Sequence, residues 1–230
     1  MPNRDPDEAI RRDHFQGDGA ARSTSRMEAF ADAVFAIAIT LTVVELEMPE
    51  KGSDLGPELL RLWPTYLGDV LATAVIGIYW VLHHFSGAIY RTTGHYFNLA
   101  TVLFLAAVGF VAFPARVFAE HVSEPANRAV GAQYFTLGLA LVSVTWLIKW
   151  VVGRRTGHVD ARLDRGYVRR LDRVYIVTAS LSVAAVALSF VSWPLGLGLA
   201  GGVTLFYLRP LETPVYLSGE SPTIEGEGSD

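Results

Sequence analysis

The sequence predicts an all-α membrane protein with six transmembrane helices in each chain. Hydrophobic residues make up 51% of its 230 residues and charged residues only 18%, whereas a soluble domain carries about a quarter charged residues. The charges are also gathered into a few segments that separate long apolar stretches. The chain contains no cysteine, which excludes disulfides, thiolate metal sites and cysteine nucleophiles.

Six apolar stretches account for the predicted helices, since a helix needs about 20 mostly apolar residues to cross the hydrocarbon core. The sixth stretch is short and rich in glycine, and a tight Val-Ser-Trp-Pro link joins it to the fifth. Five or seven spans are therefore the alternative counts. The expected spans are Met27–Met48, Leu59–Tyr90, Asn98–Ala119, Val130–Val152, Leu171–Phe190 and Trp193–Leu208.

The distribution of lysine and arginine predicts the orientation, because short connections rich in these residues stay in the cytoplasm. The segment from Lys149 to Arg173 carries eight basic residues against three aspartates, so we expect the fourth connection in the cytoplasm. Six spans then place both termini on the same side. The polar segments 1–25 and 209–230 are expected to be mobile cytoplasmic ends of one transmembrane domain, residues 26–208.

The first span carries an apolar stripe along one side. At 100° per residue its opposite side is apolar as well, which predicts a helix that is buried on all sides or touches lipid. Ile37 lies roughly 16 Å from Arg26 along the helix axis, near the middle of the membrane. The stripe consists of Phe30, Ala33, Ile37, Leu41 and Val44, with Thr40 at its edge.

Asp32 lies inside the expected membrane, where an unpaired carboxylate costs several kcal/mol. The second span runs antiparallel to the first, and its end places Trp80, His83 and His84 at the depth of Asp32. We expect one of these groups to satisfy the carboxylate; the alternative is that Asp32 reaches the interface by itself. The adjacent histidines lack the i, i+4 spacing of two metal ligands on one helix face, so no metal site is expected.

The segment "RMEAFAD", residues 26–32, resembles the R-x-x-x-F-S-D signature on the first helix of the transmembrane protein 175 potassium channels. Arg26, Phe30 and Asp32 match this signature, while Ala31 replaces its serine and removes one hydroxyl. The following "AVFAIAITLTVVELEMP" and the Trp-x-x-His of the second span are also similar to the family. The resemblance covers most of residues 22–208.

The resemblance implies a potassium-permeable cation channel in the plasma membrane, surrounded by lipid. Four identical chains would assemble as a homotetramer, with the first helices lining a central pore. The family has no carbonyl filter, and no TVGYG-like run occurs in this sequence. Potassium is implied as the permeant ion, with no cofactor and no nucleic-acid partner.

The resemblance also implies roles for individual residues. Ile37 would form the apolar constriction, and Thr40 would support this filter from behind. Leu41 and Val44 would form further rings in the pore. The residues implied to hold the helices together near the cytoplasmic side are Arg26, Phe30, Asp32, Trp80, His83 and His84.

Two other functions stay open on the residues alone. A proton-coupled secondary transporter would use Asp32, Asp69 or His83 as a proton site, and a membrane scaffold would transport nothing. An apolar stripe is by itself more typical of helix packing than of a pore. The sequence shows none of the common motifs of hydrolases, zinc proteases or nucleotide-binding enzymes, so no enzyme activity is expected.

Three further patterns concern the membrane and the packing. Gly198 and Gly202 form a G-x-x-x-G pair in the sixth span, a spacing that permits close helix contact. The arginines before the fifth span either set only the topology or bind anionic lipid headgroups. Tryptophans near the predicted span ends are expected to be interfacial anchors, namely Trp63, Trp146, Trp150 and Trp193.

Overall fold

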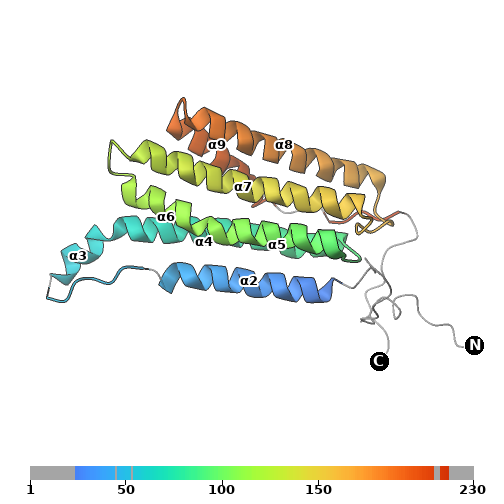
Figure 1. Cartoon of the computed structure of the whole chain (residues 1–230), viewed down its shortest axis with the longest axis horizontal. Coiled ribbons are helices and arrows are strands. Elements are labelled where there is room, and N and C mark those ends of the chain that lie inside the picture. The colour runs from blue at the N-terminus through green and yellow to red at the C-terminus, as the bar shows by residue number, and fades with distance from the viewer. Residues whose placement is uncertain (1–23, 45, 53, 210–212, 218–230) are drawn as a thin grey trace, which may run out of the picture.

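A computed structural model describes residues 24–44, 46–52, 54–209 and 213–217, and over these residues the chain is a bundle of helices (Figure 1). The all-α prediction is confirmed. Within these described ranges, five helical segments are long and apolar enough to cross a membrane. The sixth expected span forms α9 (Trp193–Phe206), whose 14 residues extend about 21 Å, less than the roughly 30 Å of the hydrocarbon core. The structure therefore does not confirm six full-length spans.

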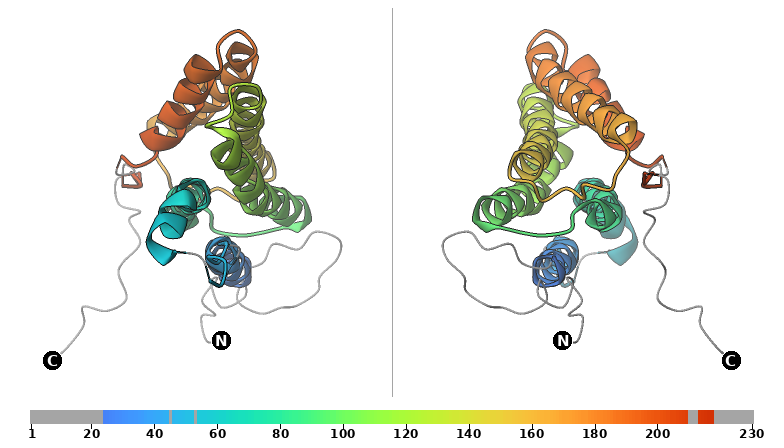
Figure 2. Two further views of the ribbon diagram at one scale, coloured as in Figure 1. Left: turned by 90° about the vertical axis from the view of Figure 1, so that its left-hand side faces the viewer. Right: turned by 90° about the vertical axis from the view of Figure 1, so that its right-hand side faces the viewer.

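The helices are arranged with the first one at an edge of the bundle. The end-on views show α2 (Ser25–Val44) on one side and α8 (Arg165–Ser189) with α9 on the opposite side (Figure 2). α7 (Arg128–Arg155) lies between them and packs against α5, α6, α8 and α9. α2 packs mainly against α4 and α5. One side of the first helix is therefore left without a neighbour from the described part of the chain.

The second expected span is divided near its start. Its first residues form a separate short helix, α3 (Leu55–Arg61), and the chain restarts as α4 (Trp63–Ser86) with Pro64 in the first turn. Proline suits this position because the first N–H groups of a helix have no intrahelical acceptor. A short 3-10 turn, η1 (Gly87–Ile89), follows α4. The membrane-length segment of the second span therefore runs from Trp63 to Ile89, and it begins after Leu59, the first residue of the expected span.

The third expected span is also divided, and here a proline explains the break. α5 (His95–Phe110) ends just before Val111, and α6 (Ala112–His121) begins just after it. Pro114 has no N–H to donate to the carbonyl of Phe110, so the regular hydrogen-bond pattern is interrupted there. The first span differs at its end, because α2 stops at Val44 rather than reaching Met48.

The fourth and fifth helices are longer than predicted. α7 and α8 leave only residues 156–164 between them. Arg154 and Arg155, which were expected in the connection, therefore lie in α7. Lys149, which the orientation argument counted with the basic segment although the expected span contained it, is 1% exposed. Lys149 is thus an interior residue of the bundle rather than a loop charge.

Part of the C-terminal segment is held by the connection between α7 and α8. Leu163 pairs with Tyr216 in an antiparallel bridge, so residues 213–217 lie along this connection. The predicted mobile N-terminal segment up to residue 23, and the predicted tail from residue 218, lie outside the described residues.

Two of the four tryptophans expected at the interface belong to the core instead. Trp146 and Trp150 are 2% and 1% exposed, and their rings meet the ring of Tyr175 edge-on at 5.7 and 5.3 Å. The anchor prediction is wrong for both residues, because α7 is the central helix and its end is covered on several sides. Trp63, in contrast, is 45% exposed at the start of α4.

The glycines of α9 differ in what surrounds them. A Cβ on Gly196 would lie 2.5 Å from the Cα of Ser189, so α8 and α9 approach each other closely at this point. A Cβ on Gly198 or Gly202 would have no atom within 4 Å. The close contact that the G-x-x-x-G spacing permits is therefore not made by Gly198 and Gly202 within the described chain, and Gly196 makes the close approach instead.

We expect Gly196→Ala to destabilise the fold by about 1–3 kcal/mol, because the backbone of Ser189 must move to make room. Gly198→Ala is the matched control on the same helix, and it should be neutral or stabilise by about 0.5–1 kcal/mol through helix propensity. The measurement is unfolding of the purified variants in detergent. Equal stability of the two variants would contradict the close approach.

Candidate pore helix and its supporting contacts

The apolar stripe of α2 faces away from the rest of the chain. The opposite face of the helix is buried against α4 and α5 through Ala31, Phe35 and Thr42. Burial on all sides is therefore not what the single chain shows. The exposed fractions along the stripe are 52% for Phe30, 58% for Ile37, 53% for Leu41 and 75% for Val44.

α2 is the least covered of the membrane-length helices. Only 17% of its most apolar 18-residue window is buried within the chain, against 33–61% in the other four. Exposure of so apolar a helix to water is unfavourable and raises the free energy of the protein. Its outer face must therefore be covered by lipid or by another protein surface, and the stripe is available for contact with other copies of α2.

Thr40 lies beside the stripe and is bound to the backbone of its own helix. Its hydroxyl donates to the carbonyl oxygens of Ala36 and Ile37, both at 3.0 Å. This hydroxyl is therefore positioned on the turn that carries Ile37. Thr42, two residues on, points to the buried face, where its hydroxyl lies 3.1 Å from the hydroxyl of Thr73.

Asp32 is paired with α4. The indole Nε1 of Trp80 donates to Oδ1 of Asp32 over 3.1 Å, so Trp80 is the partner among the three expected candidates. The ring of His84 stacks on Trp80 with centroids 5.7 Å apart. Phe30 does not lie on this side but on the exposed stripe, and Arg26 is exposed in the first turn of α2.

We expect Trp80→Phe to destabilise the protein by about 0.6–2 kcal/mol, since hydrogen bonds between membrane helices contribute about this much. The measurement is a double-mutant cycle with Asp32→Ala in unfolding experiments. If the hydrogen bond to Asp32 causes the loss of stability, Trp80→Phe lowers the free energy of unfolding less when Asp32 is already replaced by alanine. An equal loss of stability in both backgrounds would show that Trp80 acts through packing alone.

His83 points into the bundle and contacts Lys149, a residue that the sequence-based reasoning missed as a site residue. Nζ of Lys149 lies 2.8 Å from Nδ1 of His83, and the two residues are 1% and 3% exposed. The amine is also surrounded by aromatic rings, with centroids 4.7–5.9 Å from Nζ. These rings belong to Trp146, Tyr90, Phe104 and Phe97.

This buried cluster reaches the candidate pore helix. Phe35 on the inner face of α2 has its ring 5.7 Å from the ring of His83 and 6.2 Å from that of Phe104.

In the sequence, Lys149 was detectable as a lone basic residue between two tryptophans in an otherwise apolar stretch. Its inward direction depends on how α7 is rotated, which the sequence does not reveal.

Asp69 lies apart from the Asp32–Trp80 pair and from the buried cluster around Lys149. It lines a small pocket together with Thr42 of α2 and Arg116 of α6. Its Oδ1 atom is buried and has no hydrogen-bond partner among the described residues. Asp32, Asp69 and His83, the three groups proposed for proton transfer, thus have different surroundings and do not form one site.

An all-α bundle of membrane-length apolar helices, with one apolar helix exposed at its edge, defines a polytopic membrane protein. The family model described as "Endosomal/lysosomal potassium channel TMEM175" matches residues 26–112. A potassium channel from Chamaesiphon minutus (strain ATCC 27169 / PCC 6605) is 33% identical over 189 residues, which cover 80% of this chain and 93% of that relative. A potassium channel from Streptomyces collinus is also 33% identical, over 80% of this chain and 91% of its own length.

The chain therefore belongs to the TMEM175 family of potassium channels, and the resemblance carried by the signature is confirmed. The fold agrees with the crystal structure of a lysosomal potassium-selective TMEM175 homolog from Chamaesiphon minutus. The TM-score is 0.68 at 32% identity, over 80% of this chain and 96% of that one. The potassium channel MtTMEM175 T38A variant shares the fold at a TM-score of 0.56 and 16% identity, over 84% of this chain and 94% of that one.

Proposed function

We propose that this protein is a potassium-permeable channel in which four copies place α2 around a central axis. The observation that carries the proposal is the stripe of exposed apolar side chains on α2, in a chain whose relatives are named potassium channels. The stripe belongs to a helix that would line a pore without leaving its place against α4 and α5. The membrane would be the plasma membrane, with both termini in the cytoplasm.

Ile37 would form the narrowest ring, because it lies near the middle of α2 with 58% of its side chain exposed. Four isoleucines around an axis make an apolar constriction, at which ions must shed water to pass and which closes by dewetting. Leu41 and Val44 would form further rings on the same stripe. Thr40, bonded to the carbonyl of Ile37, would keep the turn of the constriction in shape.

The other face of α2 would hold the pore wall in position. Phe35 packs against His83 and Phe104, and Asp32 accepts a hydrogen bond from Trp80. These contacts connect α2 to α4 and α5 at the end where the signature lies. Rotation of α2 about its axis would break them, so they would favour one orientation of the stripe toward the pore.

The test combines two measurements: ion flux into liposomes that hold the purified protein, and the molecular mass of the purified oligomer in detergent. We expect a tetramer and potassium flux that exceeds sodium flux without a proton gradient. Flux that requires a proton gradient and saturates would indicate a transporter using Asp32, Asp69 or His83. A folded oligomer without flux under any of these gradients would indicate a scaffold. Either result would overturn the channel proposal.

A further inference from the structure

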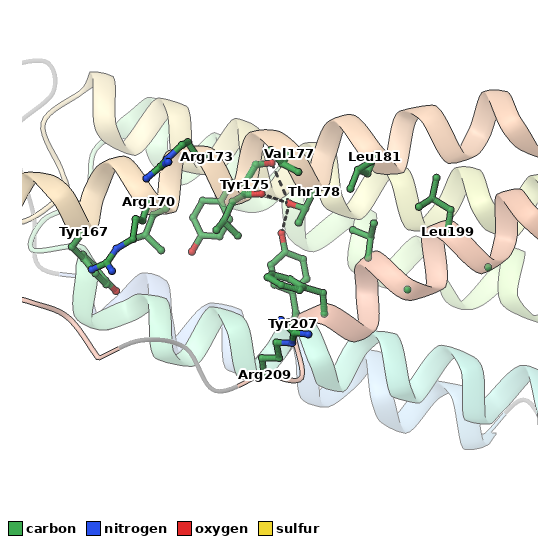
Figure 3. Close-up of a pocket in the computed structure, with 16 residues that line it drawn as sticks. Tyr167, Arg170, Arg173, Tyr175, Val177, Thr178, Leu181, Leu199, Tyr207 and Arg209 are labelled. Atoms are coloured by element: carbon green, nitrogen blue, oxygen red, sulfur yellow. Dashed lines mark hydrogen bonds between the residues drawn. The ribbon is translucent and has the colours of Figure 1, made fainter.

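An open groove of about 790 Å³ runs between α8 and α9 (Figure 3). Most of its lining is apolar and includes Leu181, Leu199 and Phe206. Three arginines line it: Arg170 and Arg173 from α8 lie toward one end, and Arg209, just after α9, lies beside Tyr207. The groove is therefore apolar along most of its length and positively charged at its mouth.

The sequence of α8 explains this polarity. The basic residues of α8 lie in its first turns, and the end of α9 lies further along α8, where Tyr207 meets Thr178. Leu181 is eleven residues beyond Arg170, which corresponds to about 16 Å along α8. The groove thus extends from the charged end of α8 well into its apolar part.

The glycines of α9 keep the groove open. Gly198 and Gly202 both line it, and a Cβ on either would meet no atom within 4 Å. Polar atoms in the middle of the groove are already paired, because the hydroxyl groups of Thr178 and Tyr207 lie 2.6 Å apart. The charged side chains among the lining residues are the three arginines.

The position of the groove in the bundle indicates where the occupant comes from. α8 and α9 lie on the side opposite α2 (Figure 2), and exposed apolar side chains flank the groove. These include Val177 at 53% and Leu181 at 40%. An apolar face on a membrane-length helix is in contact with lipid unless protein covers it.

We propose that this groove binds one anionic phospholipid, with its phosphate on Arg170 and Arg173 and an acyl chain beside Gly198 and Gly202. Arginine pairs with phosphate through bidentate hydrogen bonds, and basic residues at the membrane surface attract anionic headgroups. A lipid matches both the charged mouth and the apolar length of the groove. The inference requires only that the protein spans a membrane, and it does not depend on the pore.

The test is native mass spectrometry of the purified oligomer with added phosphatidylglycerol or phosphatidylcholine of the same acyl chains. We expect phosphatidylglycerol to be retained in preference. Each of Arg170→Gln and Arg173→Gln should weaken its binding about fivefold. Arg169→Gln is the matched control, because Arg169 is an exposed arginine of α8 outside the groove, and it should leave binding unchanged.

A second pair of variants tests the apolar part of the groove. Gly202→Leu fills it and should reduce binding of both lipids, whereas Gly201→Leu, on the same helix but outside the groove, should not. Elution of both variants as the wild-type oligomer shows that they fold. Equal retention of the two lipids by the wild type, or equal binding by the two leucine variants, would overturn the proposal. Loss of the oligomer only in Gly202→Leu would show that another copy of the chain covers the groove, which also overturns it.

Discussion

Ile37→Asn is expected to lower the preference of the channel for potassium over sodium by about tenfold or more in liposome flux. Four asparagine side chains around the pore axis offer hydrogen-bonding groups that replace part of the hydration shell of either ion. The constriction is then no longer apolar and no longer discriminates between potassium and sodium. A tenfold change corresponds to only about 1.4 kcal/mol between two barriers, and four substituted side chains act on it together. The side chain is 58% exposed in the single chain, so the exchange should be tolerated by the fold.

Val43→Asn is the matched control for this substitution. Val43 is 55% exposed on the same helix, but it lies about 120° around the axis from Ile37. The Val43→Asn variant should therefore keep a ratio of potassium to sodium flux close to that of the wild type. If both variants change the ratio equally, the constriction does not lie on the stripe; if neither does, Ile37 is not the filter.

His83→Leu is expected to destabilise the folded protein by about 1.5–3 kcal/mol. The imidazole Nδ1 lies 2.8 Å from Nζ of Lys149, and both groups are almost completely buried. Leucine removes the acceptor, so the amine keeps its desolvation cost without this hydrogen bond. Thermal unfolding of the purified oligomer in detergent measures the change.

Lys149→Met in the His83→Leu background provides the control. Removing both polar partners leaves an apolar pair of similar volume, which is often neutral compared with a buried polar pair. The double variant should therefore recover most of the lost stability. Additive losses, with no recovery in the double variant, would show that His83 acts through packing against Phe35 and Phe104 and not through Lys149.

The contacts of Lys149 show where sequence reasoning reached its limit. Its charge was counted toward the orientation of the chain, because a basic residue near the end of an apolar stretch usually lies at the membrane surface. The helix continues to Arg155, however, and the rotation of α7 directs Lys149 inward to His83. That rotation is set by the packing of α5, α6, α8 and α9 around α7, which no local pattern contains.

The same distinction applies to the pairing of Asp32. The depth of this carboxylate follows from its position in the first span, and the antiparallel second span narrows its partners to Trp80, His83 and His84. Trp80 and His83 are three residues apart and so point only about 60° apart around the helix. Only the packed structure therefore separates Trp80, which donates to Asp32, from His83, which turns inward.

The sequence by itself determined the properties that depend on local composition and spacing. These are the all-α membrane class, the family signature that begins at Arg26, and the stripe on α2 that contains Ile37. Tertiary structure alone decided which helix faces meet, that Gly196 rather than Gly198 lies against α8, and that a groove with arginines at its mouth lies between α8 and α9. The physical reason is that hydrophobicity is a property of each segment, whereas a close approach or an open space depends on the rotation and spacing of two segments together.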